Sequence, residues 1–338
     1  MSNWNAPLGV NAALAVGALA VGIMMLEIAS RVLLPISPGT RFVDAGGNEV
    51  PLGVARPLPN TEFRQVSADY DVVGHTGPLG NRIPSVDNPD VVFVGDSFTF
   101  GQGLSDGETF AAIFCDALSL RCANLGRPGT GTYRQVRVLE DYLRVDGWRP
   151  REVKLFVLAM SSSLMSGNDF DDTVQEITKA TASSDTTTTA GAASAATNPW
   201  EWIVQRRQWI LAHSNLARVG YAQFGPAVRA LAPRVAGSQL ATGIAAVAEQ
   251  LQVLADLSSE FGFRYTIYVL HPIQDLLRGT YGDTERAVRF AAGGAPVHDT
   301  ARALLANPRA SYYAYDGHFN PAGARRVAEF LLSEGGDP

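Results

Sequence analysis

Residues 91–103 read VVFVGDSFTFGQG, and this stretch decides the fold. It opens with four apolar residues, Val91 to Val94, that show no polar alternation, which is typical of a strand covered on both faces. Glycines on both sides of Asp96 and Ser97 allow the chain to turn tightly where that strand ends. A helical pattern follows, so Ser97 is expected between a parallel strand and the next helix. Open α/β sheets bind their ligands at that edge.

Three later segments carry further polar residues and glycines, two after expected strands and one before the last helix. Residues 123–131 read ANLGRPGTG, the end of a short strand and a glycine-rich turn. Residues 153–169 read VKLFVLAMSSSLMSGND, a second buried strand that ends in Gly-Asn-Asp. Residues 315–323 read YDGHFNPAG and precede the last helix. In chain order, the four segments carry a serine, a glycine, an asparagine and a histidine.

In this order and spacing the four segments resemble the SGNH/GDSL hydrolase superfamily, over roughly residues 65–332. They look closest to its GDSFTFG-type bacterial members, which are often membrane-anchored or exported. The resemblance implies that Ser97 is the nucleophile, His318 the general base and Asp316 the carboxylate that orients the base. It also implies an oxyanion hole made by the backbone N–H groups of Ser97 and Gly129 and the side-chain amide of Asn168.

Two positions depart from the pattern of this superfamily. Its third block is usually Gly-x-Asn-Asp, whereas Ser166 stands in place of the first glycine here. Its last block is often Asp-x-x-His, but position 315 is Tyr, so the carboxylate must come from Asp316 in an Asp-x-His arrangement. Asp299, on the short strand before the last block, is the competing carboxylate, and some similar sites use a Ser–His pair alone.

The residue types fit ester hydrolysis on chemical grounds. A serine hydroxyl is a weak nucleophile and needs an adjacent base. Histidine is the side chain best suited to accept and return that proton. A carboxylate on the other ring nitrogen fixes the tautomer and stabilises the imidazolium. Each donor aimed at the tetrahedral oxyanion stabilises the transition state by about 3–4 kcal/mol.

Other polar residues in these segments have structural interpretations. Asp96 and Asp169 are better explained as helix caps than as catalytic groups. The remaining histidines are scattered along the chain and are interpreted as surface or satisfied core residues: His75, His213, His271 and His298. No metal-ligand spacing occurs among the histidines and cysteines, and the sequence indicates no cofactor.

The N-terminal segment indicates a membrane anchor. Residues 6–26 read APLGVNAALAVGALAVGIMML and carry no charge. An apolar helix through Leu34 would span roughly 40 Å, enough for a bilayer core of about 30 Å. Glu27 and Arg31 can pair on one face of that helix. The stretch lacks a basic start and a small-residue cleavage site, which favours one uncleaved, single-pass transmembrane helix over a signal peptide.

The side of the membrane is argued from charge and from resemblance. Arg31 and Arg41 follow the apolar run and no Lys or Arg precedes it, so the local charge bias favours a cytoplasmic C-terminal side. Large domains cross membranes largely regardless of such charges, and proteins resembling this one usually work outside the cytoplasm. We therefore expect a periplasmic or otherwise extracytoplasmic domain. Cys115 and Cys122 fit a disulfide in an oxidising compartment and equally fit two free buried thiols.

The rest of the chain alternates apolar strands with helices. Strands are expected near 91–95, 122–125, 153–160, 263–270 and 296–299, and helices over 133–145, 243–261 and 321–333. This alternation predicts a doubly wound, flavodoxin-like parallel sheet with helices on both faces, preceded by one N-terminal transmembrane helix.

The predicted domain organisation is an anchor over 1–36, a linker over 37–64 and a hydrolase-like domain over 65–338. Residues 36–90 are rich in Pro and Gly and are interpreted as a linker plus a short strand pair that leads into the sheet. Residues 178–198 are low in complexity and cannot bury enough apolar surface to offset their ordering entropy. They are interpreted as an insertion, with a mobile lid over the site as the alternative. Residues 199–224 carry aromatic and aliphatic side chains near helical spacing and are interpreted as packed core rather than as a membrane-surface element.

These features predict a membrane-anchored serine esterase that removes O-acyl, mainly O-acetyl, groups from an extracytoplasmic carbohydrate or another small ester. Two alternatives are an O-acyltransferase that passes the acyl group to a polysaccharide hydroxyl, and a catalytically idle structural subunit of a membrane protein complex. The formal charge of −6 and the lack of basic clusters argue against a nucleic-acid partner.

Overall fold

The computed structural model describes residues 8–33, 40–53, 56–158, 169–184, 214–217, 219 and 236–334 of the chain. The chain divides into two compact units. One comprises Met1–Gly39 and Gly191–Ala232, and the other comprises Thr40–Ala190 and Pro233–Pro338. The second unit contains both β-sheets of the described residues and the segments that carry the predicted site.

The larger sheet of this unit has six strands in the order β4-β6-β5-β7-β8-β9. Their bounds are Arg82–Ser85 for β4, Val91–Val94 for β5, Cys122–Asn124 for β6, Glu152–Leu158 for β7, Arg264–Leu270 for β8 and Val297–Asp299 for β9. The β4–β6 pair is antiparallel and all other pairs are parallel. The five parallel strands lie where the sequence predicts them, and their order is that of flavodoxin-like sheets.

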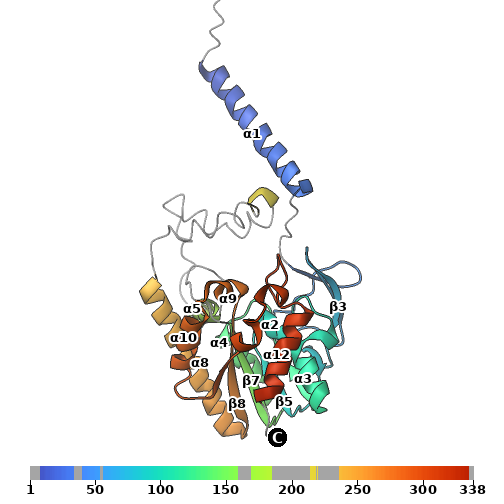
Figure 1. Cartoon of the computed structure of the whole chain (residues 1–338), viewed down its shortest axis with the longest axis vertical. Coiled ribbons are helices and arrows are strands. Elements are labelled where there is room, and N and C mark those ends of the chain that lie inside the picture. The colour runs from blue at the N-terminus through green and yellow to red at the C-terminus, as the bar shows by residue number, and fades with distance from the viewer. Residues whose placement is uncertain are drawn as a thin grey trace, which may run out of the picture. The chain divides into compact units, whose positions relative to one another are not determined.

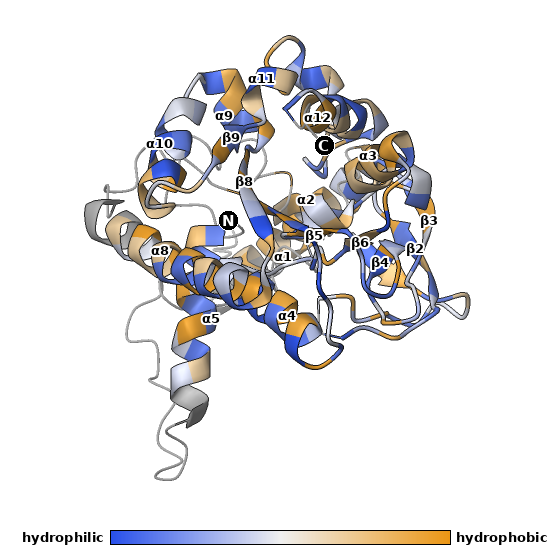
Figure 2. Cartoon of the chain, turned by 90° about the horizontal axis from the view of Figure 1, so that it is seen from below, coloured by the Kyte–Doolittle hydropathy of each residue, from blue (hydrophilic) through white to orange (hydrophobic). Residues whose placement is uncertain are grey.

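Helices cover both faces of this sheet (Figures 1 and 2). One face packs against α4 (Thr132–Arg144), α5 (Asp169–Ser184), α8 (Ala236–Phe261) and α10 (Tyr281–Ala291). The other packs against α3 (Phe110–Leu118), α9 (Ile273–Arg278), α11 (Ala301–Leu304) and α12 (Pro321–Glu334). The short helices are α2 (Ser97–Phe100), η1 (Asp106–Glu108) and η2 (Pro308–Ala310).

Alternate residues of β5 belong to the two faces. Val92 and Val94 lie in the apolar cluster with α4 and α8, whereas Val91 and Phe93 lie in the cluster with α3 and α12. All four side chains are buried. This two-sided burial is the reason that the strand shows no polar alternation in the sequence.

A smaller antiparallel sheet precedes the larger one. It consists of β1 (Arg41–Val43), β2 (Glu62–Val66) and β3 (Asp71–His75), in that order. The range 37–64, predicted as a linker, therefore contains β1 and most of β2, and the predicted boundary at residue 65 falls inside a strand. The ring of Phe63 in β2 packs 5.7 Å from that of Phe100 in α2, which joins this sheet to the segment of Ser97.

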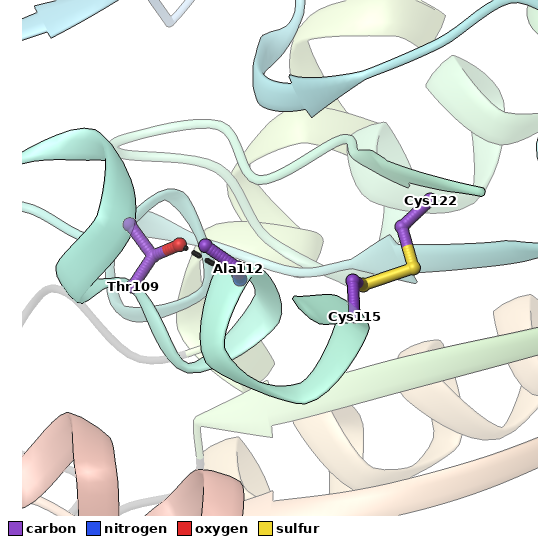
Figure 3. The surroundings of a disulfide bond; sticks show 4 residues. All are labelled: Thr109, Ala112, Cys115 and Cys122. Atoms are coloured by element: carbon purple, nitrogen blue, oxygen red, sulfur yellow. Dashed lines mark hydrogen bonds between the residues drawn. A yellow bond between two sulfur atoms is a disulfide. The ribbon is translucent and has the colours of Figure 1, made fainter. Parts of the chain in front are cut away.

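The structure has a disulfide between Cys115 in α3 and Cys122 in β6, one of the two alternatives that the sequence left open (Figure 3). Both cysteines are buried. Thr109 caps the same helix by accepting a hydrogen bond from the N–H of Ala112. A bridge that closes so short a loop stabilises a fold by about 2–3 kcal/mol through the unfolded state. It holds the helix after Ser97 against the edge of the parallel sheet.

The first unit contains helix α1 (Leu8–Leu33). Its residues Ala15–Leu33 have a mean hydropathy of 1.8 and are long and apolar enough to cross a membrane, although a signal sequence has the same properties. Glu27 pairs with Arg31 at 2.8 Å, as the spacing predicts. Its carboxylate also accepts hydrogen bonds from the Ser214 hydroxyl at 2.8 Å and from the N–H groups of Asn215 and Leu216.

The predicted insertion over 178–198 is described only in part. Its first residues, through Ser184, continue helix α5, and the remainder lies outside the described residues. Most of the aromatic segment 199–224 also lies outside them, so its predicted core packing stays a prediction.

Candidate active site

Ser97 is the first residue of the short helix α2, directly after β5. Asp96 caps this helix by accepting a hydrogen bond from the N–H of Phe98 at 2.9 Å, as the sequence predicts. Only a glycine fits at position 95, because a Cβ there would lie 2.1 Å from the Thr99 hydroxyl. The first N–H groups of a helix have no acceptor within that helix. Within the described residues, no backbone acceptor is bonded to the Ser97 N–H, which lies at the carboxyl edge of the sheet.

His318 reaches Ser97 from the loop before α12. Its Nε2 lies 2.7 Å from Ser97 Oγ, and its Nδ1 is hydrogen-bonded to Asp316 Oδ1. Gly317 between them has φ +82°, the left-handed region that favours glycine. The imidazole ring packs against Phe98 with its centroid 4.6 Å away. The structure thus brings Ser97, His318 and Asp316 into one hydrogen-bonded series.

The carboxyl of Asp316 is held in its ionised form. Burial alone would raise its pKa, but the hydrogen bond to His318, the charge of that ring and the hydroxyls of Thr40 and Tyr70 lower it to about 2. These partners outweigh desolvation because each of them favours the charged carboxylate. Asp316 therefore carries a negative charge throughout the neutral range.

The competing carboxylate, Asp299, has a different partner. Its Oδ1 lies 2.5 Å from Nε2 of His271, and Nδ1 of that histidine lies 3.1 Å from the Thr284 hydroxyl. His271 is fully buried and Asp299 nearly so. His271 is a satisfied core histidine, as predicted, and this pair occupies Asp299 away from His318.

Of the other two predicted oxyanion-hole residues, the structure describes Gly129 but not Asn168. Gly129 lies in an exposed turn with φ +70°, and open space surrounds the position of a Cβ there. Within the described part of the chain, no acceptor is bonded to its N–H. Asn168 lies outside the described residues, so its predicted role remains a prediction. The next residue, Asp169, begins α5.

The turn that contains Gly129 is fixed at both ends by close packing. Asn124 donates a hydrogen bond to the carbonyl of Thr99 in α2 and accepts one from the N–H of Gly126. At the other end, Gly131 lies so close to α5 that a Cβ would meet the backbone N of Thr173 at 2.4 Å.

Helix α5 also caps α4 across this contact. The Glu176 carboxylate accepts hydrogen bonds from the N–H groups of Gly131 and Arg134, and the Thr173 hydroxyl accepts one from Tyr133. These side chains replace the cap that Gly131 itself cannot supply. The helix that follows Asn168 is therefore docked on the glycine turn. Sequence reasoning missed this capping, since nothing local links residues 131 and 176.

Two buried carboxyls, those of Asp96 and Asp169, have raised pKa values, whereas that of Asp316 is lowered. Burial raises the pKa of Asp96 to about 6, against the effect of the His318 charge and of two backbone donors. Burial and the neighbouring charge of Asp96 raise the pKa of Asp169 well above its usual range. A carboxyl whose pKa is raised in the folded state contributes stability at acid pH, and this is lost as the pH rises through the raised pKa.

Asp169 does not cap its own helix, which corrects that part of the capping prediction. Its carboxyl accepts hydrogen bonds from the Leu158 N–H at 2.9 Å and from the Gln135 amide at 3.0 Å. It therefore ties the end of β7 to α4. Among the described residues, no group of three or more His, Cys, Asp or Glu side chains could hold a metal ion.

No protein-family model and no curated protein matches this chain. Its structural neighbours are SGNH/GDSL hydrolases and acetyl-xylooligosaccharide esterases. One is described as a lipolytic protein of the G-D-S-L family from Desulfitobacterium hafniense, with 14% identity over 72% of this chain and 97% of that chain and a TM-score of 0.37.

Two further neighbours are named as carbohydrate esterases. An acetyl-xylooligosaccharide esterase variant from Geobacillus Stearmophilus has 14% identity over 75% of this chain and 96% of that chain, with a TM-score of 0.40. An acetyl xylan esterase from Butyrivibrio proteoclasticus has 11% identity over 80% of this chain and 67% of that chain, with a TM-score of 0.35.

The contact between Gly131 and α5 predicts that Gly131→Ala destabilises the protein by about 1–3 kcal/mol, because the added methyl group forces backbone against backbone. Gly107→Ala is the matched control, since a Cβ at that position meets no atom within 4 Å. Denaturant unfolding of both variants measures the free energy. Equal stabilities would show that the glycine turn is not held by this close approach.

Proposed function

We propose that this protein is an SGNH-type serine esterase that removes O-acyl groups, in particular O-acetyl groups, from an extracytoplasmic carbohydrate. The observation that carries the proposal is the hydrogen-bonded series Ser97–His318–Asp316 at the carboxyl edge of a parallel sheet. A serine hydroxyl bonded to an imidazole, itself oriented by a carboxylate, is the arrangement that activates serine for acyl transfer.

In the proposed reaction, Nε2 of His318 removes the proton of Ser97 as its oxygen attacks the ester carbonyl. Asp316 holds the proton on Nδ1, which leaves Nε2 free to act as the base and stabilises the imidazolium that forms. The oxyanion that forms would accept hydrogen bonds from the N–H groups of Ser97 and Gly129 and from the side-chain amide of Asn168. His318 then protonates the departing alcohol. In the second half of the reaction, His318 takes a proton from water as the water attacks the acyl carbonyl, and it returns a proton to Ser97 as the acid leaves.

The substrate class is supported by the neighbours named as acetyl-xylooligosaccharide and acetyl xylan esterases. The same residues can deliver the acyl group to a sugar hydroxyl instead of water. Incubation of the full-length protein with an acetylated oligosaccharide distinguishes the two acceptors. Free acetate is the expected product, and an acetyl group moved to a second sugar would identify a transferase.

The proposed roles predict that Ser97→Ala and His318→Ala each remove most hydrolysis of p-nitrophenyl acetate by the full-length protein in detergent. The double variant is expected to be hardly worse than either single one, because the members of a triad act as a unit. His298→Ala is the control, since His298 pairs with Glu334 outside the site. Losses that add in the double variant would contradict a shared mechanism.

The two aspartate–histidine pairs predict opposite behaviour for two matched substitutions. Asp316→Asn should lower turnover by several orders of magnitude at an unchanged melting temperature, because an amide favours the wrong imidazole tautomer. Asp299→Asn should instead lower the melting temperature, because it breaks a buried pair. A severe loss of turnover in Asp299→Asn, with little loss in Asp316→Asn, would assign the orienting carboxylate to Asp299.

We also propose that α1 is an uncleaved anchor and that the second unit is extracytoplasmic. Two observations support this: the apolar span Ala15–Leu33 and the buried disulfide Cys115–Cys122, a bond that persists in oxidising compartments. In spheroplasts, added protease should digest the domain, and the unfolded, unreduced protein should not react with a maleimide. A protected domain with two reactive thiols would place it in the cytoplasm, and a mature N-terminus near residue 35 would make α1 a signal peptide.

A further inference from the structure

One oxygen of Asp316 does not face His318 and is surrounded by side-chain donors. The Thr40 hydroxyl donates to Asp316 Oδ2 at 2.8 Å, the Tyr70 hydroxyl at 2.9 Å and the Gln102 amide at 3.3 Å. The other oxygen, Oδ1, is the one bonded to His318. One oxygen of this carboxylate thus bonds the imidazole, and the other accepts hydrogen bonds from the surrounding side chains.

The three donors also contact one another. The Gln102 amide nitrogen lies 2.9 Å from the Thr40 hydroxyl and 3.3 Å from Nδ1 of His318, and the Thr40 and Tyr70 hydroxyl oxygens lie next to each other. Tyr70 and Gln102 are buried. In such a network each donor fixes the orientation of the next, so the carboxylate has few alternative positions.

None of the three donors belongs to the six-stranded sheet or to the helices that cover its faces. Thr40 immediately precedes β1, Tyr70 immediately precedes β3, and Gln102 follows α2. The backbone of the Asp316 loop is held from the same side, because Asp69 accepts hydrogen bonds from the N–H groups of Tyr315 and Asp316. The smaller sheet and its neighbouring loops therefore surround this carboxylate.

We propose that Thr40, Tyr70 and Gln102 are positioning residues, which hold Asp316 in the orientation that the triad needs and make the β1–β3 sheet a functional part of the site. This inference rests on the proposed function. Only Gly317 separates Asp316 from His318, and contacts from Thr40, Tyr70, Gln102 and Asp69 hold this short loop. A carboxylate that accepts several hydrogen bonds keeps both its charge and its direction.

Thr40 gives the proposal a further consequence. It is the first described residue after α1. A residue close in sequence to the proposed membrane span therefore donates a hydrogen bond to the proposed catalytic carboxylate. The predicted linker is then a part of the active site, and the chain must begin at or before Thr40 to complete it.

The test compares Tyr70→Phe with Tyr313→Phe in the full-length protein. Both substitutions remove one hydroxyl, and the two rings pack 4.8 Å apart, but the Tyr313 hydroxyl donates to the carbonyl of Gly103 and not to Asp316. Tyr70→Phe should lower kcat on p-nitrophenyl acetate about tenfold or more, because a hydrogen bond to a charged group is lost. KM and the melting temperature should change little, and Tyr313→Phe should retain wild-type kcat.

Thr40 supplies an independent arm of the same test. Thr40→Val should lower kcat to a similar degree, and Thr40→Ser, which keeps the hydroxyl, should retain it. The wild-type protein must first hydrolyse the ester and be labelled at Ser97 by a fluorophosphonate. If it does, an unchanged kcat in both Tyr70→Phe and Thr40→Val would overturn the positioning roles alone. A wild-type protein that is neither active nor labelled would overturn the proposed function and, with it, this inference.

Discussion

The parallel pairing of β5 with β6 and β7, and of β7 with β8, is the constraint on which the rest of the structure depends. Parallel strands end at the same edge of a sheet, so the segments that follow them meet there although they are far apart in sequence. Ser97 follows β5, the glycine turn follows β6, and Asp169 comes after β7. The register of these strands holds because both of their faces are covered by helices, and a slip would move every side chain to the wrong face.

Burial and hydrogen bonding give different pKa values to two carboxyls that lie close to Ser97. Asp316 is surrounded by donors and has a pKa of about 2, whereas Asp96 beneath the site has a pKa of about 6. The two side chains are chemically identical, so only their surroundings separate them. Asp316 therefore keeps its negative charge at acid pH values at which Asp96 is protonated, as the proposed role beside the imidazole requires.

Local patterns were sufficient for a large part of the fold. The apolar runs that became β5 to β9 show burial directly, and the helices α4, α8 and α12 show their periodicity. The short strand pair expected within 36–90 was predicted without bounds, and the structure has the three strands of the β1–β3 sheet in that range. β4, in the same range, contains Pro84, which is tolerated because this strand lies at the edge of the sheet.

The sequence by itself predicted where the candidate serine and histidine lie, because a strand end followed by a glycine-rich turn, and a polar loop before the last helix, are short-range patterns. Only the tertiary structure decided between two carboxylates, by pairing Asp299 with His271 and by leaving Asp316 to His318. It also decided what holds Asp316, since Thr40, Tyr70 and Gln102 lie more than 200 residues before it in the chain. Such contacts follow from how the β1–β3 sheet packs on the larger sheet, and no spacing or periodicity along one chain records them.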